Sequence, residues 1–280
     1  MTLEADYAAC RDLVRAEDRD RYLAALFAPA DRRQHVFSLY AFNVEIARVA
    51  EQVREPMMGE IRLQWWRDAI DGIAPGDAAG NPVANALLDT IGRFDLPKML
   101  LHELLDARAF DFQGGPMETL ARLENYLDAT STNPMRLAAT IAGGDAAEPY
   151  FAHAGRAWGI MGLLRSFGPH AARGRILAPP LEILERHGAR IDDALSGEVT
   201  ANLRAALREM RDLARFHAAE MRRLANPMPG SALAALLPAA LVPAYLGQME
   251  RADYDPFRTR IEIAPWKKPW LLWRAARRAK

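Results

Sequence analysis

The chain has 280 residues, 50% of them hydrophobic, which is enough to bury a large core within one domain. Its 36 basic and 36 acidic residues balance, so no overall charge attracts a polyanion, and we exclude nucleic acid as a partner. The single cysteine, Cys10, cannot form an internal disulfide and fits no metal-ligand spacing. The N-terminus lacks the apolar core of a secretory signal. We therefore predict a cytoplasmic protein.

Helical periodicity runs through most of the chain. Apolar residues recur every three or four positions over residues 33–53 and 117–141, which predicts amphipathic helices there. No segment shows the sustained two-residue alternation typical of a strand. Breaks rich in glycine and proline divide the chain into roughly ten helices, and they stand at residues 74–82, 114–116, 143–144, 179–180 and 226–230. The prediction is a single all-α domain over residues 1–280.

A helix predicted over residues 150–167 has an unusually bare face and runs into a loop rich in arginine. At about 100° per residue, one stripe of this helix holds Gly155, Gly159, Gly162 and Ser166. An interior glycine costs about 1 kcal/mol relative to alanine. Keeping three of them on one face therefore requires a compensating structural or functional reason.

The most apolar segment spans residues 231–247 and has no charged residue. It is shorter than the roughly 20 residues that cross a bilayer, and it contains Pro238 and Pro243. We predict a core helix with a kink.

The C-terminal tail, residues 265–280, is basic and rich in tryptophan. It has no acidic residue, and it holds Trp266, Trp270 and Trp273. Tryptophan favours the headgroup level of a bilayer, and basic side chains are attracted to anionic lipid. One interpretation is a peripheral anchor at the inner face of the membrane. The other is a terminal helix docked on the protein by its tryptophans, with its basic residues solvated.

Four blocks of sequence resemble the squalene/phytoene synthase superfamily in order and approximate spacing. They are LFAPADRRQHVFSLYAFNVEIARVAEQV, IRLQWWRDAI, YLDATSTNPMRLAATIAGG and GRAWGIMGLLRSFGPHAARGRILAPPLEILERHG. The resemblance implies an isoprenoid-synthase-like helical fold with a central cavity. It also implies that the helices over residues 33–53 and 150–167 face each other across that cavity, with Tyr40, Asn43, Gly159 and Gly162 on the cavity face.

Enzymes of that superfamily hold Mg²⁺ against a diphosphate with aspartates from two helices, because the metal requires oxygen ligands. Alignment on the family motifs places the first pair of aspartate positions at Ala47 and Glu51, and the second pair at Ser166 and His170. Glu51 is then the only carboxylate left among the four. The resemblance thus predicts degenerate metal motifs, no catalytic residue and no bound metal.

The arginines of the family pattern are still present. The resemblance puts Arg33, Arg165 and Arg175 near the position of a diphosphate or of the loop that covers it, and Arg173 belongs to the same loop. A cavity with these arginines and few acids would bind an anion through bidentate hydrogen bonds. Alternatively, the arginines pair with acids such as Glu45, Glu51 or Glu182 and serve only the structure.

One branch of the superfamily is especially similar. AFNVEIARV in place of the first aspartate motif, together with RLQWWR and ENY, resembles the complex I assembly factor 6 proteins, which are non-catalytic. This implies a non-catalytic assembly factor for respiratory NADH dehydrogenase, with its subunits or other assembly factors as partners. Two alternatives stay open: an active prenyltransferase that uses Mg²⁺ and Glu51, and a protein that binds an isoprenoid or an anionic lipid.

Overall fold

The computed structural model describes residues 2–53, 55–73, 80–112, 115–144, 149–225 and 230–278. These residues form helices and short helical turns and no strand, which confirms the predicted all-α class. The helices of the N-terminal half are α1 (Leu3–Glu17), α2 (Arg19–Ala25), α3 (Arg33–Gln52), α4 (Pro56–Asp71), α5 (Pro82–Phe94), α6 (Lys98–Ala109), η2 (Phe110–Phe112), α7 (Leu120–Leu127), η3 (Asp128–Thr132) and α8 (Asn133–Ala142).

The C-terminal half continues the same way. Its helices are α9 (Tyr150–Arg165), α10 (Phe167–Ala171), α11 (Leu181–Arg186), α12 (Ile191–Ser196), α13 (Ala201–Leu224), η4 (Gly230–Ala232), α14 (Leu233–Leu236), η5 (Leu237–Leu241), α15 (Val242–Met249) and α16 (Lys267–Arg278). The described residues thus hold more helices than the roughly ten predicted, because short turns interrupt several of the longer periodic segments.

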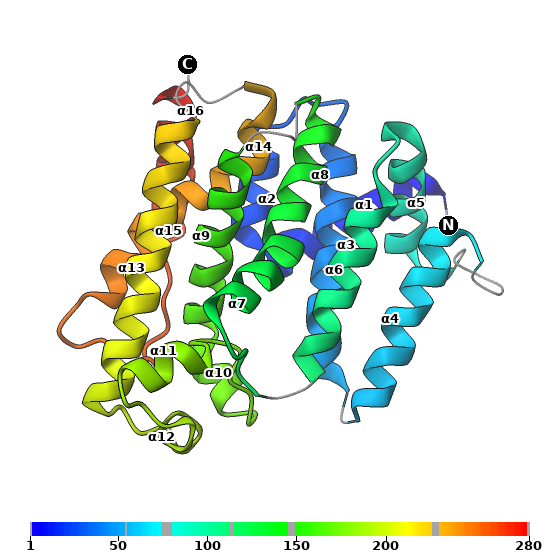
Figure 1. Ribbon diagram of the computed structural model, residues 1–280. Helices are drawn as coiled ribbons and strands as arrows, with labels where there is room; N and C mark the ends of the chain where they lie inside the picture. Colours follow the sequence, from blue (N-terminus) through cyan, green and yellow to red (C-terminus); the bar gives the residue numbers. More distant parts are fainter. Residues whose placement is uncertain are drawn as a thin grey trace.

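Two helices of the interior, α3 and α9, each pack against several others. α3 packs against α1, α5 and α8, and α9 packs along α13, so that α3 and α9 each lie in the interior of the bundle (Figure 1). The ends of the chain lie on different sides of the molecule, with α1 among the N-terminal helices and α16 beside the C-terminal ones (Figure 1). The largest fully buried side chains include Tyr40 and Phe42 of α3, Phe151 of α9 and Tyr245 of α15. Burial of such aromatic rings stabilises the bundle.

Several element boundaries differ from the predicted ones. The segment 117–141 is not one helix: η3 is a π-helical turn between α7 and α8, where residues 128–132 adopt a wider helix. α9 ends at Arg165, and Ser166 leaves helical geometry with φ −92° and ψ 3°. The interruption therefore precedes the Gly168–Pro169 pair, which lies inside α10. Predicted breaks at 74–82, 114–116 and 226–230 fall partly outside the described residues.

The apolar segment forms four short pieces instead of one kinked helix. Within the described part of the chain, Gly230–Met249 is the one stretch long and apolar enough to cross a membrane, with a mean hydropathy of 1.5. However, 61% of that window is buried inside the protein, as in a core helix. Pro238 lies in the 3₁₀ turn η5 and Pro243 begins α15, so each proline stands where its missing N–H leaves no helical bond unmade.

Candidate functional site

A cavity of about 230 Å³ lies between α3, α7, η3, α9 and α10. The residues that line it are Arg21, Ala47, Glu51, Arg108, Asp111, Tyr126, Leu127, Thr130, Ser131, Trp158, Gly159, Gly162, Leu163, Ser166, His170, Arg175 and Leu177. All four aligned metal-motif positions therefore share one cavity, although they come from two segments far apart in the sequence. Arg173 lies beside it, in an adjoining pocket that Glu51 and Arg175 also line.

Besides Arg173, four of the predicted site residues do not line this cavity. Tyr40 and Asn43 are buried in the core, and the Tyr40 hydroxyl and Asn43 Oδ1 have no hydrogen-bond partner in the part of the chain that the structure describes. Arg33 donates to the carbonyl of Ala28 at 3.2 Å. Arg165 points away, because it precedes Ser166 by one residue and so leaves α9 about 100° around the helix from it.

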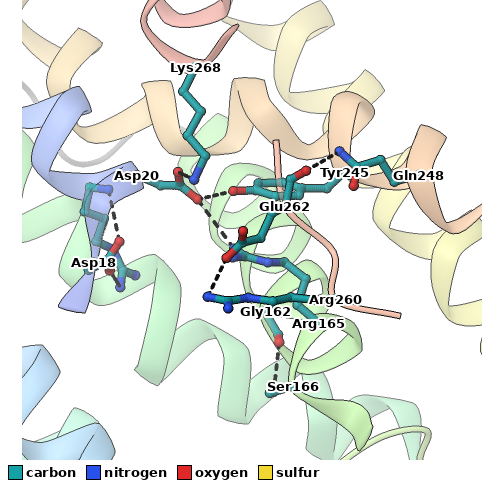
Figure 2. A network of polar contacts seen from close by, with 11 residues as sticks. Asp18, Asp20, Gly162, Arg165, Ser166, Tyr245, Gln248, Arg260, Glu262 and Lys268 are labelled. Carbon is teal, nitrogen blue, oxygen red and sulfur yellow. Dashed lines mark hydrogen bonds and ion pairs between the residues drawn. The ribbon is translucent and has the colours of Figure 1, made fainter. Parts of the chain in front are cut away.

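Arg165 belongs to a buried cluster centred on Asp20. Its Nη1 lies 3.4 Å from Asp20 Oδ2, and its guanidinium lies over the Tyr245 ring at 4.2 Å. The Tyr245 hydroxyl donates to the same carboxylate, and Lys268 Nζ reaches Asp20 Oδ1 at 2.6 Å (Figure 2). The cluster joins α2, α9, α15 and α16. Arg165 therefore helps to hold the C-terminal helix and does not face the cavity.

Close packing against η3 accounts for two of the glycines on the bare face of α9. A Cβ at Gly155 would lie 2.1 Å from Thr132 Oγ1 and 2.5 Å from its Cα. One at Gly159 would lie 2.7 Å from Ser131 Oγ of η3 and 2.6 Å from a methyl group of Leu127 at the end of α7. At Gly162 nothing lies within 4 Å of the added atom, which would project toward the cavity. The sequence alone suggested that functional side chains had been lost from this whole face. For Gly155 and Gly159 the reason is steric, and only Gly162 is open.

The cavity holds a buried charge network that the sequence did not reveal. Arg108 Nη1 lies 3.2 Å from Asp111 Oδ2 and 2.9 Å from the Tyr126 hydroxyl, which donates to Asp111 Oδ1 at 2.8 Å. Arg175 donates to the backbone carbonyl of Asp111 at 3.3 Å. The available signals were the three-residue spacing of Arg108 and Asp111 and the ENY motif. Neither signal shows that the two segments meet at the cavity.

The other charged groups near the cavity also have partners. Arg21 pairs with Asp18 at 3.1 Å, and Arg173 pairs with Glu51 at 3.6 Å near the surface. The predicted alternative of structural pairing therefore holds for Arg173 and Glu51. Among the described residues, Glu45 and Glu182 form no ion pair with the cavity arginines. Glu182 instead accepts hydrogen bonds from Arg186 and from the backbone of Leu120. Three arginines and two carboxylates line the cavity.

His170 is held in its neutral form. Burial, together with the nearby cations Arg175, Arg173 and Arg108, lowers the pKa of His170 to about 4. A neutral imidazole avoids adding another positive charge beside these arginines. Among the described residues, no group of three or more His, Cys, Asp or Glu side chains is placed to hold a metal ion.

The C-terminal helix α16 packs against the rest of the protein, but its tryptophans do not make the contacts. Its buried residues are Lys268, Leu272 and Ala276. Trp266, Trp270 and Trp273 are 72%, 50% and 48% exposed. The docking prediction was thus wrong about the contacts, because the apolar stripe that faces the protein is offset from the tryptophan stripe by the helical repeat.

Comparison with known proteins places the chain in a family. The model of the family squalene/phytoene synthase matches residues 14–274. The chain belongs to the squalene/phytoene synthase family. It is 29% identical to NADH dehydrogenase (ubiquinone) complex I, assembly factor 6, of Bos taurus, over 90% of this chain and 76% of that protein. It is 25% identical to phytoene synthase of Thermus thermophilus, over 97% and 92% of the two chains.

The fold of the family is found in solved structures as well. The crystal structure of a dehydrosqualene synthase in complex with ligand superposes with a TM-score of 0.82 at 19% identity, covering 98% of this chain and 96% of that one. This likeness establishes the isoprenoid-synthase helical fold that the resemblance implied.

Proposed function

We propose that the protein is a non-catalytic assembly factor for respiratory NADH dehydrogenase that acts at the membrane surface. The observation that carries the proposal is the state of the carboxylates in the cavity. Glu51 pairs with Arg173, and Asp111 is fixed by Arg108 and Tyr126. The remaining aligned positions are Ala47, Ser166 and His170, which offer no carboxylate. These residues do not fit an Mg²⁺ cluster, which requires several free oxygen ligands.

The size of the cavity supports the same proposal. Ligand pockets usually measure about 300–1,000 Å³, whereas this cavity has about 230 Å³. A head-to-head prenyltransferase must hold two prenyl diphosphates at once. The assembly role is proposed by analogy with the relatives named complex I assembly factor 6. The similarity of one such relative extends over 90% of this chain.

A second candidate function rests on the arginines. Arg21 and Arg175 line the cavity together with Arg108, and within the described ranges the guanidinium of Arg175 has a hydrogen bond to a backbone carbonyl and no ion pair. A small phosphate-bearing or isoprenoid ligand would therefore find cationic hydrogen-bond donors there. This candidate keeps the fold and the cavity but requires no metal and no turnover.

An activity assay separates the proposal from the prenyltransferase alternative. Purified protein is incubated with farnesyl or geranylgeranyl diphosphate and Mg²⁺, and hydrocarbon products are extracted and measured. We expect no product from the wild type or from Glu51→Gln. Mg²⁺-dependent turnover by the wild type that Glu51→Gln abolishes, with folding intact, would overturn the proposal.

A further inference from the structure

A second hollow lies on the C-terminal side of the molecule, away from the cavity between α3, α7, η3, α9 and α10, which is called the family cavity from here on. It is a groove of about 440 Å³ between α13, η5, α15 and α16. Its apolar lining includes Met221, Ala244 and Leu271, and its charged lining consists of Arg222, Arg274 and Arg278. The volume lies within the range of small-molecule sites. Sequence reasoning did not find it, because its walls come from segments that are separated along the chain.

Two of the three arginines of the groove are held by contacts weaker than ion pairs. Arg222 donates only to the carbonyl of Ala218 on its own helix, and Arg274 lies over the ring of Trp270 at 5.3 Å. Within the described ranges, neither they nor Arg278 form an ion pair, and no acidic side chain lines the groove. Their guanidinium groups therefore retain donors for an anion.

The wall that α16 supplies is fixed in place and carries exposed tryptophans. The buried ion pair between Lys268 and Asp20 ties the start of α16 to α2 (Figure 2). On the outer surface of the same helix, Trp270 and Trp273 are half exposed, and Trp266 just before it is more exposed still. Exposed tryptophans favour the interface between lipid headgroups and acyl chains. The helix that forms one wall of the groove therefore also carries exposed tryptophans that favour the surface of a bilayer.

We infer that this groove binds one anionic phospholipid of the membrane surface, with an acyl chain on the apolar lining and the phosphate on Arg222, Arg274 and Arg278. The combination requires an amphiphile, because a free phosphate leaves the apolar lining empty and a neutral lipid leaves the arginines unpaired. Charge complementarity and the neighbouring tryptophans favour a lipid over a peptide. The inference specifies the membrane contact of the proposed function and does not depend on which complex the protein helps to assemble.

The test is calorimetric titration of the full-length protein with a short-chain lipid kept below its micelle concentration. The probe is dihexanoylphosphatidylglycerol, and the controls are dihexanoylphosphatidylcholine and inorganic phosphate. We expect saturable binding near one lipid per protein for the anionic lipid, and at least about tenfold weaker binding for both controls. Equal binding of the two lipids, or of phosphate and the anionic lipid, would contradict the inference.

Paired variants separate a specific groove from general attraction of opposite charges. Arg222→Gln and Arg274→Gln remove groove arginines, whereas Arg223→Gln and Arg277→Gln remove the same charge from neighbouring positions that do not line the groove. We expect about tenfold weaker binding for each groove variant and little change for its control. Equal losses within each pair would show a diffuse electrostatic effect and would overturn the inference.

A third set of variants distinguishes the groove from the tryptophan surface. Ala244→Phe fills the groove, and Trp266→Ala with Trp273→Ala removes exposed rings that do not line it. We expect Ala244→Phe to abolish binding of the short-chain lipid with helical content and melting temperature retained. The double tryptophan variant should keep that binding but adhere less to phosphatidylglycerol vesicles. Undiminished lipid binding by a folded Ala244→Phe protein would overturn the inference, whatever a separate measurement of NADH dehydrogenase assembly shows.

Discussion

The family cavity pairs two of its three arginines with carboxylates, whereas the groove beside α16 pairs none of its arginines within the described residues. In the family cavity, Arg108 is enclosed by Asp111 and Tyr126, and Arg21 is paired with Asp18. In the groove beside α16, Arg222 and Arg274 have no acidic partner among the residues that the structure describes. A charge that is satisfied internally stabilises the folded chain, whereas a charge held without a partner at a solvent-facing apolar surface is available to another molecule.

Under the proposed function, the cavity between α3 and α9 serves mainly the structure, because Asp111 and Glu51 pair with arginines there. Under the inference drawn from the groove, the arginines beside α16 are the ones that bind another molecule. Substitutions in the cavity should therefore change stability, and substitutions in the groove should change binding with little effect on stability.

The largest effect is expected at the buried network. Arg108→Met leaves Asp111 with a buried carboxylate whose ion pair is lost, and removing one partner of such a pair costs about 3–5 kcal/mol. Urea unfolding measures the free energy of unfolding. The control is Arg67→Met, which removes an ion pair with the exposed Asp106 and should cost no more than about 1 kcal/mol. Similar losses in the two variants would show that the cavity network is not a special contributor to stability.

The second effect separates the glycines of α9. Gly155→Ala forces a Cβ against the backbone of Thr132, so we expect a loss of about 1–3 kcal/mol, whereas Gly162→Ala enters open space and should gain up to about 1 kcal/mol from helix propensity. Thermal melting of both variants, followed by circular dichroism, gives the comparison. If Gly155→Ala were stabilising, the close packing of α9 on η3 would be incorrect.

The third effect is a pH dependence. Because the pKa of His170 is lowered to about 4, the unfolded chain takes up a proton near pH 6.5 and the folded protein does not. Stability from this residue is therefore fully present above pH 6.5 and declines as the pH falls toward 4. His170→Gln should reduce the loss of unfolding free energy between pH 7 and pH 4.5 by roughly 1–2 kcal/mol. An unchanged difference between wild type and variant across this range would contradict the assignment.

The smallest expected change in stability is for variants of the groove arginines. Arg222→Gln and Arg274→Gln should leave the free energy of unfolding within about 0.5 kcal/mol of the wild type, because neither side chain forms an ion pair with any described residue. Urea unfolding measures this directly. A loss as large as that of Arg108→Met would mean that the groove arginines are structural, and the contrast between the two hollows would fail.

Periodicity and motif spacing were sufficient for the class of fold and the placement of its central helices. Residues 33–53 and 150–167 were predicted as helices, and the structure has α3 at Arg33–Gln52 and α9 at Tyr150–Arg165. The family resemblance assigned Ala47, Glu51, Ser166 and His170 to the metal motifs, and all four line one cavity. The bounds of the helices follow from the helical repeat, whereas the grouping of these four residues came from the resemblance.

Contacts between distant segments could not be obtained in the same way. The steric need for Gly155 depends on the π-helical turn η3, and the direction of Arg165 depends on Asp20, 145 residues earlier. The same limit applies to the tail, where composition indicated a membrane contact but not which side of α16 is buried. Such features are properties of packing, and each requires the position of a second segment.

The most direct test of the proposed function is a deletion of this gene in its own host, with membranes assayed for assembled NADH dehydrogenase and for rotenone- or piericidin-sensitive NADH oxidation. We predict that deletion lowers the amount of the assembled complex, and that both the wild type and Glu51→Gln restore it in proportion to their abundance. Normal assembly in the deletion strain, or restoration by the wild type but not by an equally abundant Glu51→Gln protein, would contradict the central claim.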